Sequence, residues 1–228
     1  ARFKWLRNIL DIGCGRGFFV FKAMEYGYSV EGIDVSLPEE QSRLVPEKMR
    51  ELYIEQKISE GVKYDCLSFH GVLEHINDYD SFLGFCRELL KSPGLILFSI
   101  PLLEGPLYSI CEKLYRFSCG IVKTPWLTLL QWHSSSPHIF LPTKGGVRHL
   151  LNSHFIVKSI DSFRQPMIDR ARILHRVRLE CKSYDQGLFK NILLYALGII
   201  AIVIDWISDK CNLINEAFFI AQIVDQSN

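Results

Sequence analysis

Short apolar runs alternate with amphipathic segments over most of the chain. Residues 95–100 are apolar without alternation, which is typical of a central parallel strand covered on both faces. Residues 79–91 place apolar side chains at i, i+3, i+4 and i+7, which predicts a helix with one buried face. Applied to the whole chain, the pattern predicts strands at 8–12, 28–34, 52–56, 63–69, 95–100, 155–163 and 216–222, and helices at 18–26, from about Pro46, at 79–91 and at 143–152. Strands and helices alternating in this order indicate a doubly wound α/β fold.

Two longer segments interrupt this alternation. Residues 102–141 are aromatic and irregular in pattern, and we expect a lid or a wall of a substrate site there. Residues 164–215 join a basic, helical stretch to an uncharged run at 192–204, which as a helix would cover about 20 Å of a bilayer core about 30 Å thick. One interpretation places both parts in the fold or in a homodimer interface. The other places 164–207 in peripheral contact with a membrane, with arginines meeting anionic head groups.

The composition of the chain limits which binding partners and which cellular locations we expect. A length of 228 residues suits a single domain spanning 1–228, and a hydrophobic fraction of 48% excludes disorder. The net charge of +1 provides no broad field for nucleic acid, so we expect no nucleic-acid partner. Seven cysteines without a C-x-x-C pair indicate reduced thiols, and the chain begins without an apolar leader segment. We therefore expect a cytoplasmic protein, peripheral at the inner face of the membrane under the second interpretation above.

A glycine-rich turn joins the first strand to the first helix in the pattern Asp11-x-Gly13-x-Gly15-x-Gly17. Glycine allows positive φ and lets a ligand approach the backbone, and the following helix directs its free N–H groups into the turn. The turn is therefore predicted to hold a small molecule. A dinucleotide fingerprint needs two residues before its last glycine, so the spacing counts against a nicotinamide oxidoreductase.

The second strand ends in Asp34, 23 positions after Asp11. A carboxylate at this place can accept hydrogen bonds from both hydroxyls of a ribose. The alternative is a turn or helix-capping role. Its pairing with the glycine turn favours the ligand-binding interpretation.

These motifs, with residues 64–83 and 136–160, resemble the class I S-adenosylmethionine-dependent methyltransferases. The similarity is strongest to a subgroup that includes ubiquinone-biosynthesis O-methyltransferases and other lipid and small-molecule enzymes. It implies a Rossmann-like, mostly parallel seven-stranded sheet with 164–215 as a helical, apolar insertion between the last two strands. It also implies S-adenosyl-L-methionine as cofactor. The cofactor contacts that we expect are Asp11, Gly13, Cys14, Gly15, Gly17, Phe18, Asp34, Val35, Phe69, His70 and Leu73.

The methyl acceptor is predicted to be a small or lipid-linked molecule, methylated at oxygen. A hydroxyl acceptor must lose a proton, and histidine is the side chain best suited to take it near neutral pH. Our candidates are His138, then His75 and His133, with a structural role as the alternative for each. Glu74 and His75 are adjacent potential ligands without a third, so no metal is predicted. The other hypotheses are a non-catalytic cofactor-binding or scaffold protein and a nucleic-acid methyltransferase, which the absence of an (Asn/Asp)-Pro-Pro-(Tyr/Phe) motif disfavours.

Overall fold

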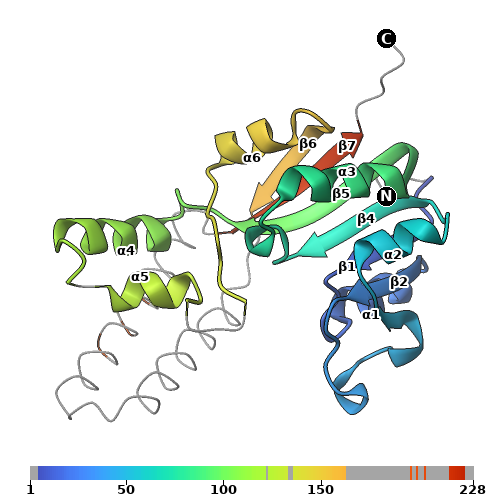
Figure 1. Cartoon of the computed structure of the whole chain (residues 1–228), viewed down its shortest axis with the longest axis horizontal. Helices are drawn as coiled ribbons and strands as arrows, with labels where there is room; N and C mark the ends of the chain where they lie inside the picture. The colour runs from blue at the N-terminus through green and yellow to red at the C-terminus, as the bar shows by residue number, and fades with distance from the viewer. Residues whose placement is uncertain are drawn as a thin grey trace. The chain divides into compact units, whose positions relative to one another are not determined.

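The structure, a computed structural model, describes residues 5–121, 123–132, 136–162, 196, 199, 203 and 216–223. The chain divides into two compact units (Figure 1). The first comprises Ala1–Ile100, Lys144–Asp161 and Phe218–Asn228, and the second comprises Pro101–Thr143 and Ser162–Ala217. Of the predicted features, His133 and all but three residues of the 164–215 insertion lie outside the described residues. Within the described part, no helix is both long enough and apolar enough to cross a bilayer.

A seven-stranded sheet in the order β3-β2-β1-β4-β5-β7-β6 forms the centre of the fold. Its strands are β1 (Asn8–Ile12), β2 (Ser29–Asp34), β3 (Met49–Glu51), β4 (Tyr64–His70), β5 (Leu90–Pro101), β6 (Phe155–Ser162) and β7 (Glu216–Ile223). The first five strands pair in parallel, and Figure 1 shows β7 running opposite to both of its neighbours. The predicted doubly wound, mostly parallel fold is confirmed.

Helices cover the sheet and lie between its strands along the chain. The first unit contains α1 (Phe18–Glu25), α2 (Ile54–Ser59), α3 (Tyr79–Leu89) and α6 (Lys144–Leu151), and the second contains α4 (Pro106–Phe117) and α5 (Thr124–Leu129). The strand order moves one way from β1 to β2 and the other way from β4 to β5. With the right-handed crossovers that parallel strands favour, this order places α1 and α3 on opposite faces. Figure 1 shows α3 alongside β4 and β5.

Stacked aromatic rings fill the centre of the sheet's core. Phe98 stacks on Phe69 with ring centroids 5.1 Å apart and on Phe219 at 5.0 Å, and Phe82 of α3 meets the edge of Phe69 at 5.4 Å. Phe69, Phe98 and Phe219 are fully buried. These contacts tie β4, β5 and β7 to α3, so the carboxyl ends of the central strands are held on a rigid layer.

The structure differs from four of the predicted features. The third strand was expected at 52–56, but β3 ends at Glu51 and α2 begins at Ile54. The expected helix from Pro46 is a single 3-10 turn, Pro46–Lys48. The predicted strand at 95–100 starts earlier, because Leu90 already pairs with Tyr64. Residues 102–141 were expected to be irregular, yet they contain α4 and α5. Proline at the first position of α4 fits its start, since the missing N–H has no helical partner there.

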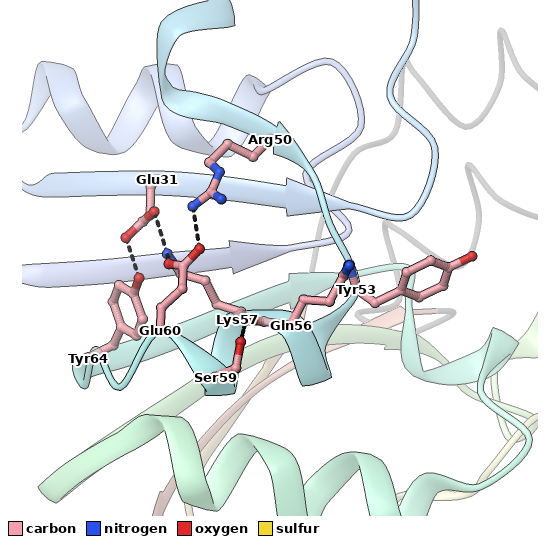
Figure 2. Close-up of polar contacts among 8 residues, drawn as sticks. All are labelled: Glu31, Arg50, Tyr53, Gln56, Lys57, Ser59, Glu60 and Tyr64. Carbon is pink, nitrogen blue, oxygen red and sulfur yellow. Dashed lines mark hydrogen bonds and ion pairs between the residues drawn. The ribbon is translucent and has the colours of Figure 1, made fainter.

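The buried Lys57 of α2 ties three strands together (Figure 2). Its side chain is 2% exposed, and Nζ lies 2.8 Å from Glu31 Oε2 and 2.7 Å from Glu60 Oε2. Glu60 also pairs with Arg50 at 2.6 Å, and the Tyr64 hydroxyl donates to Glu31. Burial alone would lower the pKa of Lys57, but the hydrogen bonds to both carboxylates outweigh it and the pKa is raised. The ammonium therefore keeps its charge throughout the physiological range.

We expect Lys57→Met to lower the free energy of unfolding by about 2 kcal/mol. This is less than for a fully enclosed pair, because the two carboxylates are 33% and 29% exposed and solvent screens them. Urea denaturation measures the effect. The matched control is Lys22→Met, which removes an exposed ion pair with Glu25 and should change little. Equal effects of the two substitutions would contradict the special role of the buried lysine.

Candidate cofactor site

The glycine turn after β1 is held by main-chain hydrogen bonds to the neighbouring strand. Gly13 N and Cys14 N both donate to Ile33 O, at 2.8 and 3.1 Å, and Gly17 N donates to Cys14 O at 2.8 Å. Gly13, Gly15 and Gly17 have φ of 71°, 52° and 84°. Residues that carry a Cβ are strained in this left-handed region. The backbone shape of the turn therefore explains why glycine occupies these three positions.

Gly13 and Gly15 differ in what surrounds them. A Cβ on Gly13 would overlap Val72 Cγ2, so protein fills that side of the turn. A Cβ on Gly15 would meet nothing within 4 Å. The turn is therefore packed from one side at Gly13 and open at Gly15.

Gly13→Ala is expected to reduce the free energy of unfolding by about 2 kcal/mol, through overlap with Val72 and strain at positive φ. Adding Val72→Ala should remove the overlap and leave only the strain. Chemical denaturation of the two single variants and the double variant gives the coupling between the sites. Purely additive losses would show that Val72 is not what excludes a side chain at position 13.

Asp34 connects the glycine turn to the end of β2. Its Oδ2 accepts from Gly15 N at 2.9 Å and its Oδ1 accepts from Ser36 N at 3.1 Å. The side chain is half-buried. Each carboxylate oxygen has a second acceptor position, so Asp34 can still bind two ligand hydroxyls. The predicted ribose acid therefore lies directly beside the open part of the turn.

Asp11 lies beneath the turn and is 3% exposed. Ser68 Oγ of β4 donates to its Oδ1 at 2.7 Å, and these two residues are also register partners. Burial raises the pKa of Asp11 to about 7, the negative charge of Asp34 adds to the increase, and the Ser68 hydrogen bond opposes it. A cationic group bound nearby would stabilise the ionised form of this carboxyl.

The other predicted cofactor residues fall into two groups. The side chains of Cys14, Phe69 and Leu73 are buried in the core. Phe18 and Val35 are 64% and 58% exposed at the ends of the turn and of β2.

His70, the remaining predicted contact, ends β4 as a half-buried ring. It stacks on Phe218 at 5.5 Å and tilts against Phe19 at 5.1 Å. Burial lowers the pKa of His70 to about 4, so the imidazole is neutral at physiological pH.

Residues 2–154 match a protein family described as "Methyltransferase domain". The chain belongs to this methyltransferase family. The match covers about two thirds of the chain and confirms the resemblance found in the sequence, with S-adenosylmethionine as the family's cofactor.

Curated relatives of this methyltransferase include two ubiquinone biosynthesis O-methyltransferases. The protein from Cereibacter sphaeroides (strain ATCC 17025) is 30% identical over 148 residues, covering 60% of this chain and 53% of the relative. The protein from Chelativorans sp. (strain BNC1) is 38% identical over 101 residues, covering 41% and 40%. The chain thus spans about half the length, or less, of the curated relatives it matches.

Solved structures show the same fold. A SAM-dependent methyltransferase from Archaeoglobus fulgidus aligns with a TM-score of 0.55 at 17% identity, covering 96% of this chain and 87% of that one. A cyclopropane synthase from Mycobacterium tuberculosis aligns with a TM-score of 0.56 at 16% identity, covering 96% and 79%. At such identities the likeness supports the fold and nothing finer.

The methyltransferase turn fits its cofactor on three counts. The space at Gly15 leaves room for a ligand against the backbone. Asp34 keeps acceptor positions for ribose hydroxyls. Asp11 offers a carboxyl for the ammonium of the methionine end. These residues were all predicted, whereas the contacts of Ser68 and Val72 were missed. The sequence signal for Ser68 was its hydroxyl in the middle of a mostly apolar strand, and that strand pairs with the strand of Asp11.

Two of the candidate bases can be placed. His75 is half-buried in the 3-10 turn Leu73–His75 that follows β4. His138 belongs to the second unit, is 7% exposed, and has Nε2 2.6 Å from Gln131 Nε2. This contact gives His138 Nε2 a hydrogen-bonding partner in the side chain of Gln131.

Proposed function

We propose that this chain binds S-adenosylmethionine in the Asp11–Gly17 turn and transfers its methyl group to an oxygen of a small or lipid-linked acceptor. The observation that carries the proposal is the arrangement at Gly15. Its N–H is bonded to Asp34, its Cβ direction is open, and Asp11 lies in the strand that leads into the turn. The oxygen acceptor is supported by the ubiquinone O-methyltransferases among the relatives. A hydroxylated quinone precursor with an apolar tail fits both the small and the lipid-linked description.

The protein's contribution to this reaction is mainly binding and orientation. The cofactor supplies a carbon activated by its sulfonium when it is bound. Asp34 would hold the ribose hydroxyls, and Asp11 would pair with the ammonium of the methionine end. The neutral ring of His70 packs with the rings of Phe19 and Phe218 at the end of β4, and these rings would exclude water from that side. A histidine would accept the proton of the acceptor hydroxyl.

Transfer of labelled methyl groups tests the reaction directly. The wild-type chain is incubated with methyl-labelled S-adenosylmethionine and hydroxylated quinone precursors with and without a polyprenyl tail, and the product's labelled atom is identified. A labelled methyl group attached to an oxygen of the acceptor supports the proposal. Cofactor binding without turnover on any acceptor would favour the non-catalytic alternative, and label on nitrogen or carbon would contradict the choice of atom.

The base is tested by histidine substitutions in the same assay. If His138 is the base, His138→Ala should lower kcat by about a hundredfold or more while the cofactor Kd stays unchanged. His75→Ala is measured in parallel, and His149→Ala, on an exposed position of α6, is the control. Full activity of His138→Ala would remove that residue from the proposal, and a selective loss in His75→Ala would assign the role to His75.

A further inference from the structure

Residues 36–44, which we call the strap, lie in the connection between β2 and β3 and join two parts of the candidate cofactor site. The strap follows β2, which ends at Asp34. It returns to the glycine turn, where Leu44 N donates to Arg16 O at 3.0 Å. The hydrogen bond from Gly15 N to Asp34 closes this path into a ring. The strap therefore borders the place where Asp34 would bind a ribose.

Both ends of the strap are anchored, whereas its centre is exposed. Near the first end, Leu37 packs partly buried against the core. After the second end, Val45 and Met49 are buried, and Met49 fills the space beside Gly17, where a Cβ would lie 2.7 Å from the Met49 sulfur. Residues 39–41, between these anchors, are exposed. An exposed segment between two fixed points can move while the sheet beneath it stays in place.

Hydrogen bonds within the strap hold it together as one body. Arg43 Nε donates to Pro38 O at 2.7 Å, and Arg43 N donates to Glu40 O at 3.0 Å. Ser42 Oγ donates to Glu39 O, also at 2.7 Å. The centre of the strap is thus bonded mainly to itself, and we expect it to move as a unit.

The side chain of Arg16 fastens this centre to the glycine turn. Its Nε donates to Ser42 O at 3.0 Å, and its guanidinium carbon lies 5.8 Å from the ring centroid of Phe18. Phe18 is the first residue of α1, so the guanidinium contacts both the helix and the strap. A single exposed hydrogen bond contributes little to stability, so it can break and form again without unfolding the protein.

We propose that the strap is a gate for the cofactor and that Arg16 is the latch that keeps it closed. The inference rests on the proposed function, because the gate acts on the same site. The strap moves away from Arg16 to admit S-adenosylmethionine and closes again beside the ribose. The bond from Arg16 to Ser42 is the same in the closed protein with and without cofactor. Arg16 is therefore a positioning residue that sets how often the gate opens, and not how tightly the closed site binds.

Surface plasmon resonance with the immobilised full chain tests the latch. Arg16→Met keeps a long side chain but removes the donor, so the gate should open about fivefold more often. The association and dissociation rate constants of S-adenosylmethionine should both rise about fivefold, with Kd changed by less than about twofold. Arg16→Lys carries a donor again and should restore slower rates. Arg148→Met, at an exposed position of α6, is the matched control and should leave both rates unchanged.

Hydrogen exchange without cofactor measures the opening independently. The amide of Leu44 is bonded to Arg16 O, so it exchanges when the strap leaves the turn. It should exchange about fivefold faster in Arg16→Met than in wild type. Saturating S-adenosylmethionine should slow the exchange in both proteins. Circular dichroism establishes that the variants are folded, as expected for changes at the exposed Arg16.

The possible results separate the latch from the proposed reaction. Unchanged rate constants or unchanged exchange at Leu44 in Arg16→Met would overturn the latch. A higher Kd with an unchanged association rate would also overturn it, because Arg16 would then contact the cofactor directly. Failure of the wild-type chain to bind S-adenosylmethionine would contradict the proposed function and the role of the strap as a cofactor gate. The exchange at Leu44 would still decide whether Arg16 holds the strap closed.

Discussion

Asp11→Asn is expected to stabilise the unliganded protein at pH 8 while weakening S-adenosylmethionine binding about thirtyfold or more. The wild-type carboxyl is buried, and its pKa is raised to about 7 from 3.8. Between these values the native state binds more protons than the unfolded state, so stability falls as pH rises from about 4 to 7. Asparagine has a similar shape and can still accept the Ser68 hydrogen bond, but it carries no charge to be desolvated. The gain at pH 8 should be about 2 kcal/mol.

In the proposed complex, the same substitution removes the partner of the cofactor's ammonium. Wild-type affinity should rise as pH increases through about 7, because binding selects the ionised carboxyl. The variant should bind weakly with no such dependence. Thermal unfolding from pH 5 to 9 and calorimetric titration measure the two effects, and Asp80→Asn, at an exposed carboxylate, is the control. A lower Tm of Asp11→Asn at pH 8 would show that the buried charge is compensated in some other way.

Gly15→Ala should weaken cofactor binding about thirtyfold while leaving the protein folded. The new methyl group meets no protein atom, so the loss in stability is limited to about 1 kcal/mol of strain at φ 52°. The same methyl group occupies space that a ligand needs when it lies against the backbone. Binding should therefore fall far more than stability.

Gly27→Ala provides the matched comparison. Gly27 has φ 83°, and its Cβ position is equally open, but it lies at the end of α1 rather than in the turn. Both variants should lose similar amounts of stability, measured by urea denaturation, and only Gly15→Ala should lose affinity, measured by calorimetry. Equal affinities of the two variants would place the cofactor elsewhere.

Most of the parallel sheet was predictable because its strands have strong local patterns. β1, β2, β4 and β5 have local patterns typical of strands, and the glycine turn has a spacing of its own, whereas their order in the sheet came from the structure. β3 was misplaced because a three-residue edge strand is defined by its pairing with Gly32–Asp34 rather than by its own side chains. In 102–141 the helical spacing of Tyr108 and Cys111 fixes the buried side of α4, but two residues are too few to predict a helix.

The candidate site was predictable where a single local sequence motif specifies both the residue type and its position in the fold. Asp11, Gly15 and Asp34 met this condition. The Ser68 contact depends on the register between two strands that are 57 residues apart, and the Val72 contact depends on a side chain from another loop. The pairing of His138 with Gln131 depends on a turn in which Gln131 has φ 54°. No local pattern encodes such contacts.

The two hydrogen bonds that Asp34 accepts have a practical consequence for redesign of the enzyme toward bulkier cofactor analogues. A change at Asp34 would release Gly15 N and Ser36 N and deform the turn together with its selectivity. The adjacent Val35 is 58% exposed and takes no part in those bonds. If the turn holds the cofactor as proposed, Val35 is therefore the better position to make room for a synthetic analogue, because the hydrogen bonds that hold the turn would remain intact.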